Sequence, residues 1–112
     1  MTLNLSFNEI KVISGINTCK QLRKLDLSHN FISKIQNLSE LKILNVLNLS
    51  NNWISDLNDL NLLNDHNKAL EDLFLKCNPI SSGKNYRGEV YFRISKLNRL
   101  DGVIKSDKDK LL

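Results

Sequence analysis

The sequence predicts an α/β solenoid with a short parallel sheet on its concave side, 3₁₀ or short helical turns on its convex side, and a C-terminal capping helix. Three observations lead to this fold class. The motif Leu-x-x-Leu-x-Leu-x-x-Asn-x-Ile recurs along the chain, and its Asn positions are 22, 22 and 26 residues apart. After the last copy, apolar residues follow one another at spacings of four, four and three, which is typical of a helix. Repeats of this length stack because none of them can bury its apolar face alone.

The composition is that of one globular domain. The chain has 112 residues, of which 41% are hydrophobic and 25% charged, with a formal net charge of +4. It contains no apolar run of about 18 residues and starts without a basic segment ahead of an apolar one, so we expect neither a membrane segment nor secretion. We expect a cytoplasmic protein, with the nucleus as an open alternative.

Residues 1–80 are predicted to contain about four repeats, the first of them incomplete. Each repeat contains Leu-x-Leu, a strand fragment that points both leucines to one side and the residue between them to the other. Full copies begin at Leu22, Leu44 and Leu70, whereas the first copy begins at its second leucine, Leu3. We expect stacked copies to form a parallel sheet with roughly 4.8 Å between strands and one continuous leucine core.

The Asn of each copy is predicted to be structural. These residues, Asn8, Asn30, Asn52 and Asn78, form a column at the turn after each strand, where backbone polar groups leave the sheet. A side-chain amide carries donors and an acceptor, so it can satisfy such groups in neighbouring coils.

The segments that return to the next strand are expected to hold short helical or 3₁₀ turns and little long helix. The interval of 26 residues places four extra residues within 58–68. The loop-forming residues there are Asn61, Asn64, Asp65, His66 and Asn67. We expect a loop that bulges from the convex side and tolerates replacement, with a dedicated contact site as the alternative.

Residues 81–104 are predicted to form a C-terminal cap. The apolar face of its helix consists of Tyr86, Val90, Ile94 and Leu97. Such a helix would cover the core of the last coil. Residues 105–112 carry alternating charges and no core pattern, so we interpret them as a linker or tail. The first coil has no equivalent cap, and we expect further repeats or a partner to cover it.

The motif, its 22-residue spacing and the apolar residues Ile35, Leu38 and Leu41 resemble the leucine-rich repeat family, in its short 22-residue class. The cap also resembles that family, which has a Tyr-Arg opening and a Leu-Asp-Gly ending. Here these residues are Tyr86, Arg87, Leu100, Asp101 and Gly102. Within the class, the chain is similar to the protein-phosphatase-1 regulatory subunit and to axonemal dynein light chains. The resemblance implies protein binding without catalysis.

The residues between and beside the strand leucines are expected to form a binding face. One column is Thr2, Lys24, Val46, Asp72 and Arg99, the next is Asn4, Asp26, Asn48 and Phe74, and the third is Ser6, Ser28, Ser50 and Lys76. Charges of both signs mix here, which suits a protein better than a phosphate backbone. The predicted central contacts are Lys24, Asp26, Val46, Asn48, Asp72 and Phe74. For any single position, an ordinary solvated residue is the alternative.

A second candidate surface is a rim beside the Asn column. Phe31 and Trp53 follow the Asn in adjacent coils, so they are expected about 5 Å apart, outside the core. Two such neighbours indicate either mutual packing over the Asn turns or a hydrophobic docking rim. The column that directly precedes the Asn residues, Phe7, His29, Asn51 and Cys77, is expected on the concave face as its outermost column.

The sequence offers no catalytic or metal-binding pattern. Its four glycines and two histidines form no phosphate-binding loop, paired-histidine zinc motif or nucleophile elbow. His29 and Cys77 share a column but lie two coils, or roughly 10 Å, apart, far beyond the ~3 Å of a working dyad. Cys19 and His66 fall on return segments and cannot complete a metal site with them. We expect no enzyme activity, no metal, no cofactor and two free thiols.

The sequence therefore favours a protein-binding module. The family resemblance implies a cytoskeletal, ciliary, centrosomal or phosphatase-regulatory setting for it, with the cytoskeleton or a cilium as the specific places. A basic patch around the cap comprises Lys84, Arg87, Arg93, Lys96 and Arg99. Its simplest interpretation is solvated helix charge, so we expect no nucleic acid, although an acidic tail or RNA is the less favoured alternative. Two other functions stay open. One, which the family resemblance also implies and the basic cap keeps open, is a spliceosomal small-ribonucleoprotein subunit that binds an RNA-recognition-domain protein. The other is a structural segment of a larger protein.

Overall fold

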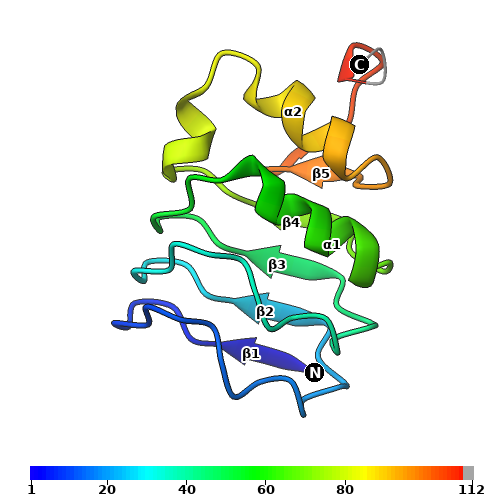
Figure 1. Cartoon of the computed structure of the whole chain (residues 1–112). Helices are drawn as coiled ribbons and strands as arrows, with labels where there is room; N and C mark the ends of the chain where they lie inside the picture. Colours follow the sequence, from blue (N-terminus) through cyan, green and yellow to red (C-terminus); the bar gives the residue numbers. More distant parts are fainter. Residues whose placement is uncertain (110–112) are drawn as a thin grey trace.

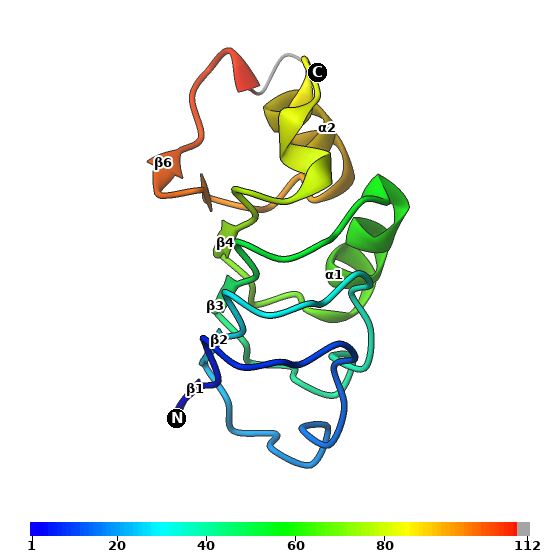
Figure 2. The ribbon, with the colours of Figure 1, turned by 90° about the vertical axis from the view of Figure 1, so that its left-hand side faces the viewer.

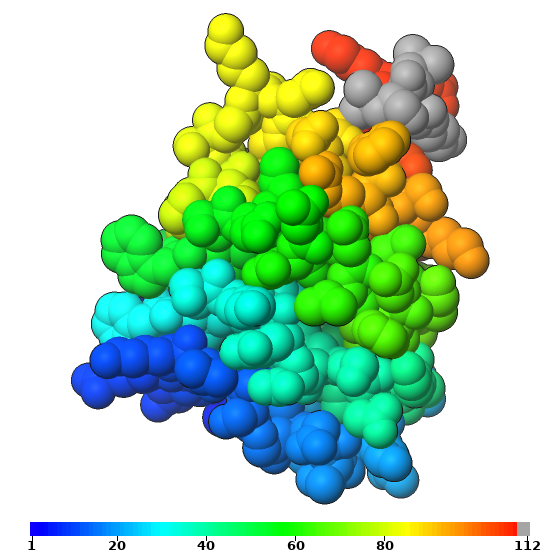
Figure 3. Space-filling view, viewed as in Figure 1, coloured from blue at the N-terminus to red at the C-terminus, as the bar shows by residue number. Residues whose placement is uncertain are grey.

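The computed structural model describes residues 1–109. The repeats build one sheet in which strands adjacent in sequence are also adjacent in space. Its strands are β1 (Thr2–Asn4), β2 (Lys24–Asp26), β3 (Val46–Asn48), β4 (Asp72–Phe74), β5 (Arg99–Leu100) and β6 (Val103–Ile104). Strands β1 to β5 are parallel, and β6 is antiparallel to β5. Figures 1 and 3 show the coils as successive layers of one stack. The predicted α/β solenoid is confirmed.

The leucines of the motif form the core. Leu25, Leu47 and Leu73, in the middle of their strands, are at most 1% exposed. The equivalent Leu3 in β1 is only half-buried. Within residues 1–109 no coil packs on the outer side of β1, which is an edge of the sheet. The first coil is therefore the exposed apolar end of the stack.

The extra residues of the third coil are helical, so the expectation of a loop there was wrong. The 3₁₀ helix η1 (Leu57–Asp59) leads directly into α1 (Leu60–His66). Leu60 and Leu63 are buried one helical turn apart, and their burial outweighs the loop preference of the Asn residues between and after them. Figure 2 shows α1 and α2 on the side opposite the strands.

The cap continues the sheet as well as covering the core. After η2 (Pro79–Ser82), helix α2 (Tyr86–Arg93) places Val90 over the last coil, where it is fully buried. The hairpin from β5 to β6 turns at Asp101 and Gly102, which have φ angles of 54° and 79°. Positive φ at both positions is what a two-residue hairpin requires, and Asp-Gly meets that requirement.

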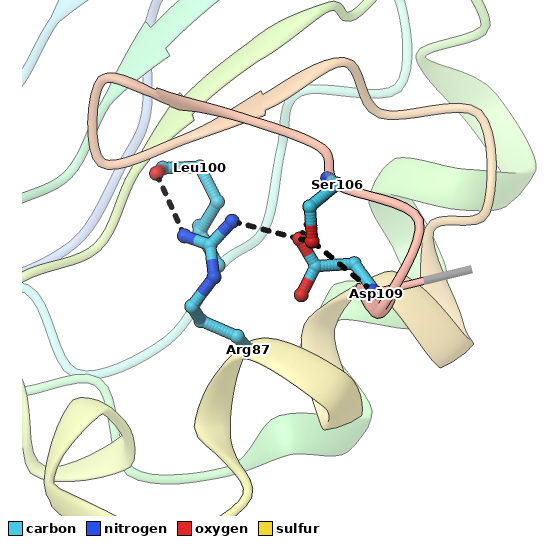
Figure 4. A network of polar contacts seen from close by, with 4 residues as sticks. All are labelled: Arg87, Leu100, Ser106 and Asp109. Carbon is cyan, nitrogen blue, oxygen red and sulfur yellow. Dashed lines mark hydrogen bonds and ion pairs between the residues drawn. The ribbon is translucent and has the colours of Figure 1, made fainter. Parts of the chain in front are cut away.

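The segment after β6 folds back onto α2 as far as Asp109 (Figure 4). The Arg87 guanidinium donates to the Leu100 carbonyl at 3.2 Å and to Asp109 Oδ2 at 3.1 Å. The backbone N–H of Ser106 also donates to Asp109 Oδ2, at 2.9 Å. This N–H and the Arg87 cation hold the pKa of Asp109 below its ordinary value. Residues 110–112 of the predicted tail lie outside the described part of the chain.

Candidate functional site

Two columns of side chains cross the outer, concave face of the sheet. The strand register aligns Thr2, Lys24, Val46, Asp72 and Arg99 in one column and Asn4, Asp26, Asn48 and Phe74 in the other. The leucines between these columns point into the core, so the columns face away from it. All six predicted contact residues, from Lys24 to Phe74, therefore lie on one surface. We call this surface the concave face.

Two of the six residues also hold the turns of the repeat. Asp26 Oδ1 accepts the backbone N–H of Ser28 at 2.9 Å and its hydroxyl at 2.7 Å. Asn48 makes the same two bonds with Ser50, at 3.0 and 2.7 Å. Ser28 is buried, so the expectation that it forms part of the outer face was wrong. Its hydroxyl turns toward the Asp side chain because this bond satisfies both groups.

Phe74 occupies the position that holds Asn or Asp in the first three coils, and it cannot accept these hydrogen bonds. Asp101 of the cap accepts the equivalent turn N–H, that of Lys76, instead. Its Oδ1 accepts the backbone N–H groups of Leu75 at 2.7 Å and Lys76 at 3.0 Å. An apolar side chain can therefore stand at position 74 because a carboxylate about 26 residues further along the chain satisfies the turn.

Tyr86 fixes the other oxygen of Asp101. Its hydroxyl donates to Asp101 Oδ2 at 2.7 Å, so the first and last parts of the cap motif contact each other directly. Burial and this hydrogen bond to a carboxylate raise the pKa of Tyr86 well above its ordinary value. Leu100 is fully buried beside them. The predicted cap residues thus support the strand end that carries Phe74.

Charges of both signs flank the apolar part of the concave face. Arg99 Nη1 lies 3.8 Å from Asp72 Oδ2, a long ion pair at the cap end. A shallow depression of about 300 Å³ lies beside this pair, between Glu71 and Lys105. Lys24, at the other end of the face, is exposed and makes no side-chain hydrogen bond or ion pair within residues 1–109. The face can therefore meet a partner of mixed charge.

The Asn column forms a ladder of hydrogen bonds. Asn52 Nδ2 donates to the carbonyls of Leu49 in its own coil and Leu27 in the preceding coil, at 3.1 and 3.0 Å. Its Oδ1 accepts the N–H of Ile32 at 3.0 Å. Asn30 and Asn78 make the equivalent bonds and are buried as well. Asn8, which has no preceding coil, is exposed and bonds only within its own coil.

A groove of about 540 Å³ runs over this ladder. We call it the ladder groove. Its walls are the residues on either side of the ladder in three successive coils, namely His29, Asn51 and Cys77 on one side and Phe31, Trp53 and Pro79 on the other. Phe31 is 49% exposed and Trp53 is 61% exposed. Within residues 1–109, the stacked ring pair is Phe7 with His29, at 4.0 Å between centroids, rather than Phe31 with Trp53.

The sequence analysis assigned the two walls of this groove to two different columns and did not predict that they line one groove. The signal was present, because both columns flank the ladder Asn at one residue before and one residue after it. The residue before the Asn has a positive φ in each coil, as at His29 (56°) and Asn51 (58°). This repeated turn geometry brings the two columns to the edges of one groove.

The basic patch around the cap is partly neutralised. Arg93 pairs with Glu89 at 2.8 Å, while Arg87 and Arg99 contact Asp109 and Asp72. Within residues 1–109, no three His, Cys, Asp or Glu side chains lie close enough to hold a metal ion. Neither helix in that part of the chain has the length and apolar character needed to cross a membrane.

Comparisons with known proteins agree with this geometry. Residues 2–40 match the family model described as Leucine Rich repeats (2 copies). Comparison with curated proteins gives no match. A chain in the crystal structure of the Drosophila melanogaster SNF/U2A′ complex is 26% identical, with a TM-score of 0.77 over 97% of this chain and 76% of that one.

Two further solved structures cover the chain less completely. An internalin (inlF) from Listeria monocytogenes is 25% identical, with a TM-score of 0.66 over 91% of this chain and 28% of that one. The Mex67 LRR domain from Chaetomium thermophilum is 27% identical, with a TM-score of 0.66 over 79% of this chain and 62% of that one. The repeat motif, the family match over residues 2–40 and the stacked parallel sheet agree, and the chain has the leucine-rich repeat fold.

Proposed function

We propose that this protein is a non-enzymatic module that binds a protein partner through its concave face. The observation that carries the proposal is an apolar centre formed by Val46 on β3 and Phe74 on β4, both half-buried in the free chain. As diagonal neighbours on adjacent strands, they lie about 7–8 Å apart. An apolar and aromatic centre inside a polar rim is the usual source of binding energy at protein interfaces.

The charges around this centre support a protein partner. Along one column the residues are Lys24, Val46, Asp72 and Arg99, so the sign of the charge changes within three strands. A phosphate backbone would be repelled by Asp72, whereas a protein surface of mixed charge can match both signs. The general role of leucine-rich repeats in protein–protein interaction supports the same conclusion.

The test is capture of partners from the native cell by the wild-type protein and by the double variant Val46→Asp/Phe74→Ala. Both residues are half-buried on the sheet surface, so we expect the variant to fold, and its circular dichroism checks this. We expect partners to be lost from the double variant. Phe92→Ala is the matched control because Phe92 is an exposed aromatic residue on α2, away from the sheet. Partners retained by the double variant would refute the concave face as the binding site.

The settings proposed for this module are cytoskeletal, ciliary, centrosomal or phosphatase-regulatory, in the cytoplasm. Their support is the resemblance of the repeat class and cap to proteins of those settings. We further propose that other repeats or a partner cover the exposed end at β1, where Leu3, Leu5 and Ile10 are half-buried. If further repeats provide the cover, the chain is a structural segment of a larger protein.

A second candidate function is a small-ribonucleoprotein-type subunit that binds an RNA-recognition-domain protein. The observation that favours it is the similarity to a chain of the SNF/U2A′ complex over 97% of this chain. The capture experiment separates the two candidates by the identity of the proteins lost from the double variant. Loss of splicing proteins, with the protein located in the nucleus, would support the second candidate, whereas loss of phosphatase, tubulin or dynein would support the first.

A further inference from the structure

The turn after β4 differs from the turns after β1, β2 and β3. In the first three coils, the Asn or Asp that ends the strand accepts the N–H and the hydroxyl of a serine two residues later, at distances between 2.6 and 3.0 Å. In the fourth coil both members of this pair are replaced together, the acceptor by Phe74 and the serine by Lys76. The turn after β4 is therefore held in another way.

One carboxylate oxygen of Asp101 holds this turn, and it takes the place of two acceptors. The N–H of Leu75 donates to Asp101 Oδ1 at 2.7 Å, whereas the equivalent leucines of the first three coils donate to backbone carbonyls of the next strand at 2.8 Å. The N–H of Lys76 donates to the same oxygen at 3.0 Å, where the earlier coils use their own Asn or Asp. Position 74 is thereby relieved of the hydrogen bonds that fix the side chains at positions 4, 26 and 48.

This relief makes the outward positions of the column unequal. An apolar substitution at Asp26 or Asn48 leaves a serine N–H and hydroxyl without their acceptor, and polar groups deprived of a partner destabilise the fold. At position 74 the acceptor lies in the cap, so the turn does not depend on which side chain stands there. Position 74 is thus free to carry a side chain chosen for contact with a partner.

The cap also supports the ring of Phe74. A Cβ atom on Gly102 would lie 3.9 Å from Phe74 Cε1, an ordinary van der Waals distance, so the ring lies beside the hairpin turn. Val46 is its diagonal neighbour on β3, and both residues stay half-buried. The cap therefore supplies the hydrogen bonds that permit an apolar residue at position 74 and a surface against which the ring is held.

We propose that Phe74 is the specificity-determining residue of the concave face and that Asp101 is its positioning residue. This inference rests on the proposed function, because it assigns roles within the same binding surface. Phe74 selects a partner that places an apolar side chain beside Val46, since a charged side chain would lose its hydration there without gaining a counter-charge. Asp101 acts through Phe74, because both of its carboxylate oxygens are engaged within the chain.

The first test is a double-mutant cycle in urea unfolding, which needs no partner. Asp101→Ala removes the acceptor of two N–H groups in the wild type. In the Phe74→Asn background, the new amide can accept the Lys76 N–H as Asn48 accepts that of Ser50. We expect Asp101→Ala to raise the unfolding equilibrium constant roughly tenfold less in that background. Equal effects in the two backgrounds would overturn the role of Asp101.

A second comparison leaves the cap intact and decides the question if Asp101→Ala does not fold. Asn48→Leu deprives the turn of its acceptor, whereas Phe74→Leu keeps an apolar side chain at a position that the turn does not use. We expect Asn48→Leu to raise the unfolding equilibrium constant roughly tenfold more than Phe74→Leu does. Equal effects of the two substitutions would overturn the claim that position 74 is released.

The last test measures selection of the partner. Its probe is the set of cellular proteins that the wild type captures and Val46→Asp/Phe74→Ala loses. Phe74→Lys is expected to reduce their capture roughly tenfold while its circular dichroism stays that of the wild type. Phe92→Lys, which places the same charge on α2 at a residue 69% exposed, is expected to capture them normally.

The outcomes separate this inference from the proposed function. Unchanged capture by Phe74→Lys, with loss confined to the double variant, overturns the inference alone. Unchanged capture by the double variant overturns the inference and the proposed function together.

Discussion

Removal of the Asn52 side chain is expected to destabilise the protein by about 2–3 kcal/mol, mainly through one buried backbone group. The Ile32 N–H donates to Asn52 Oδ1 at 3.0 Å, and in Asn52→Ala it is left buried without an acceptor. An orphaned buried donor costs about 1–3 kcal/mol. Loss of the Asn52 bonds to the carbonyls of Leu27 and Leu49 costs less free energy, because each carbonyl keeps a second donor, Asn30 and Asn78 respectively.

The matched control is Asn8→Ala, the same substitution at the exposed end of the ladder. Asn8 donates only to Leu5 and Ser6 of its own coil, and no backbone N–H within residues 1–109 donates to its Oδ1. We expect a cost of about 0.5 kcal/mol or less, as is usual for surface substitutions. The measurement is urea unfolding followed by far-ultraviolet circular dichroism. Equal losses for Asn8→Ala and Asn52→Ala would show that the ladder's bonds between coils do not stabilise the stack.

Two further predictions concern the cap and the third coil. The pKa of Tyr86 is raised on folding, so the stabilisation from its protonated hydroxyl is complete below about pH 10, the usual tyrosine pKa, and is lost as pH rises toward the folded value. In urea unfolding, the free energy of unfolding of the wild type is therefore expected to fall between pH 9 and 11, by more than that of Tyr86→Phe. An equal fall for the two proteins would contradict the assignment. Leu60→Ala is expected to cost about 2–4 kcal/mol because Leu60 is fully buried in α1, whereas Leu62→Ala, at a site 41% exposed on the same helix, is expected to cost about 0.5 kcal/mol or less. Similar thermal unfolding of the two variants would mean that this insertion is a replaceable loop.

Most of the fold could be predicted from the sequence because the repeat makes contacts local. Each coil touches only its neighbours, so the spacing of 22 residues is enough to align Leu25 with Leu47 and Asn30 with Asn52. The hydrogen bonds of the ladder follow from the same register. The cap helix was predictable for a similar reason, since the apolar face of a helix shows in the spacing of its residues.

The concave face could be predicted in position but not in chemistry. The alternation of a strand places Asp26 and Asn48 on the outside, yet both side chains also accept hydrogen bonds within their turns. Whether a carboxylate or amide on a strand serves a partner or its own turn depends on local geometry that residue spacing does not specify. The ladder groove depends in the same way on the turn that brings its two walls together.

The sequence by itself determined the strand register, the Asn ladder and the two outward columns of the strands, because all of these repeat with one period. The tertiary structure decided what departs from that period. It made the insertion a helix because buried leucines outweighed the preference of Asn for loops. It also allowed Phe74 to replace the usual Asn or Asp, because Asp101 reaches the same turn from the cap. Such contacts join residues that share no repeat position, so only the packed chain brings them together.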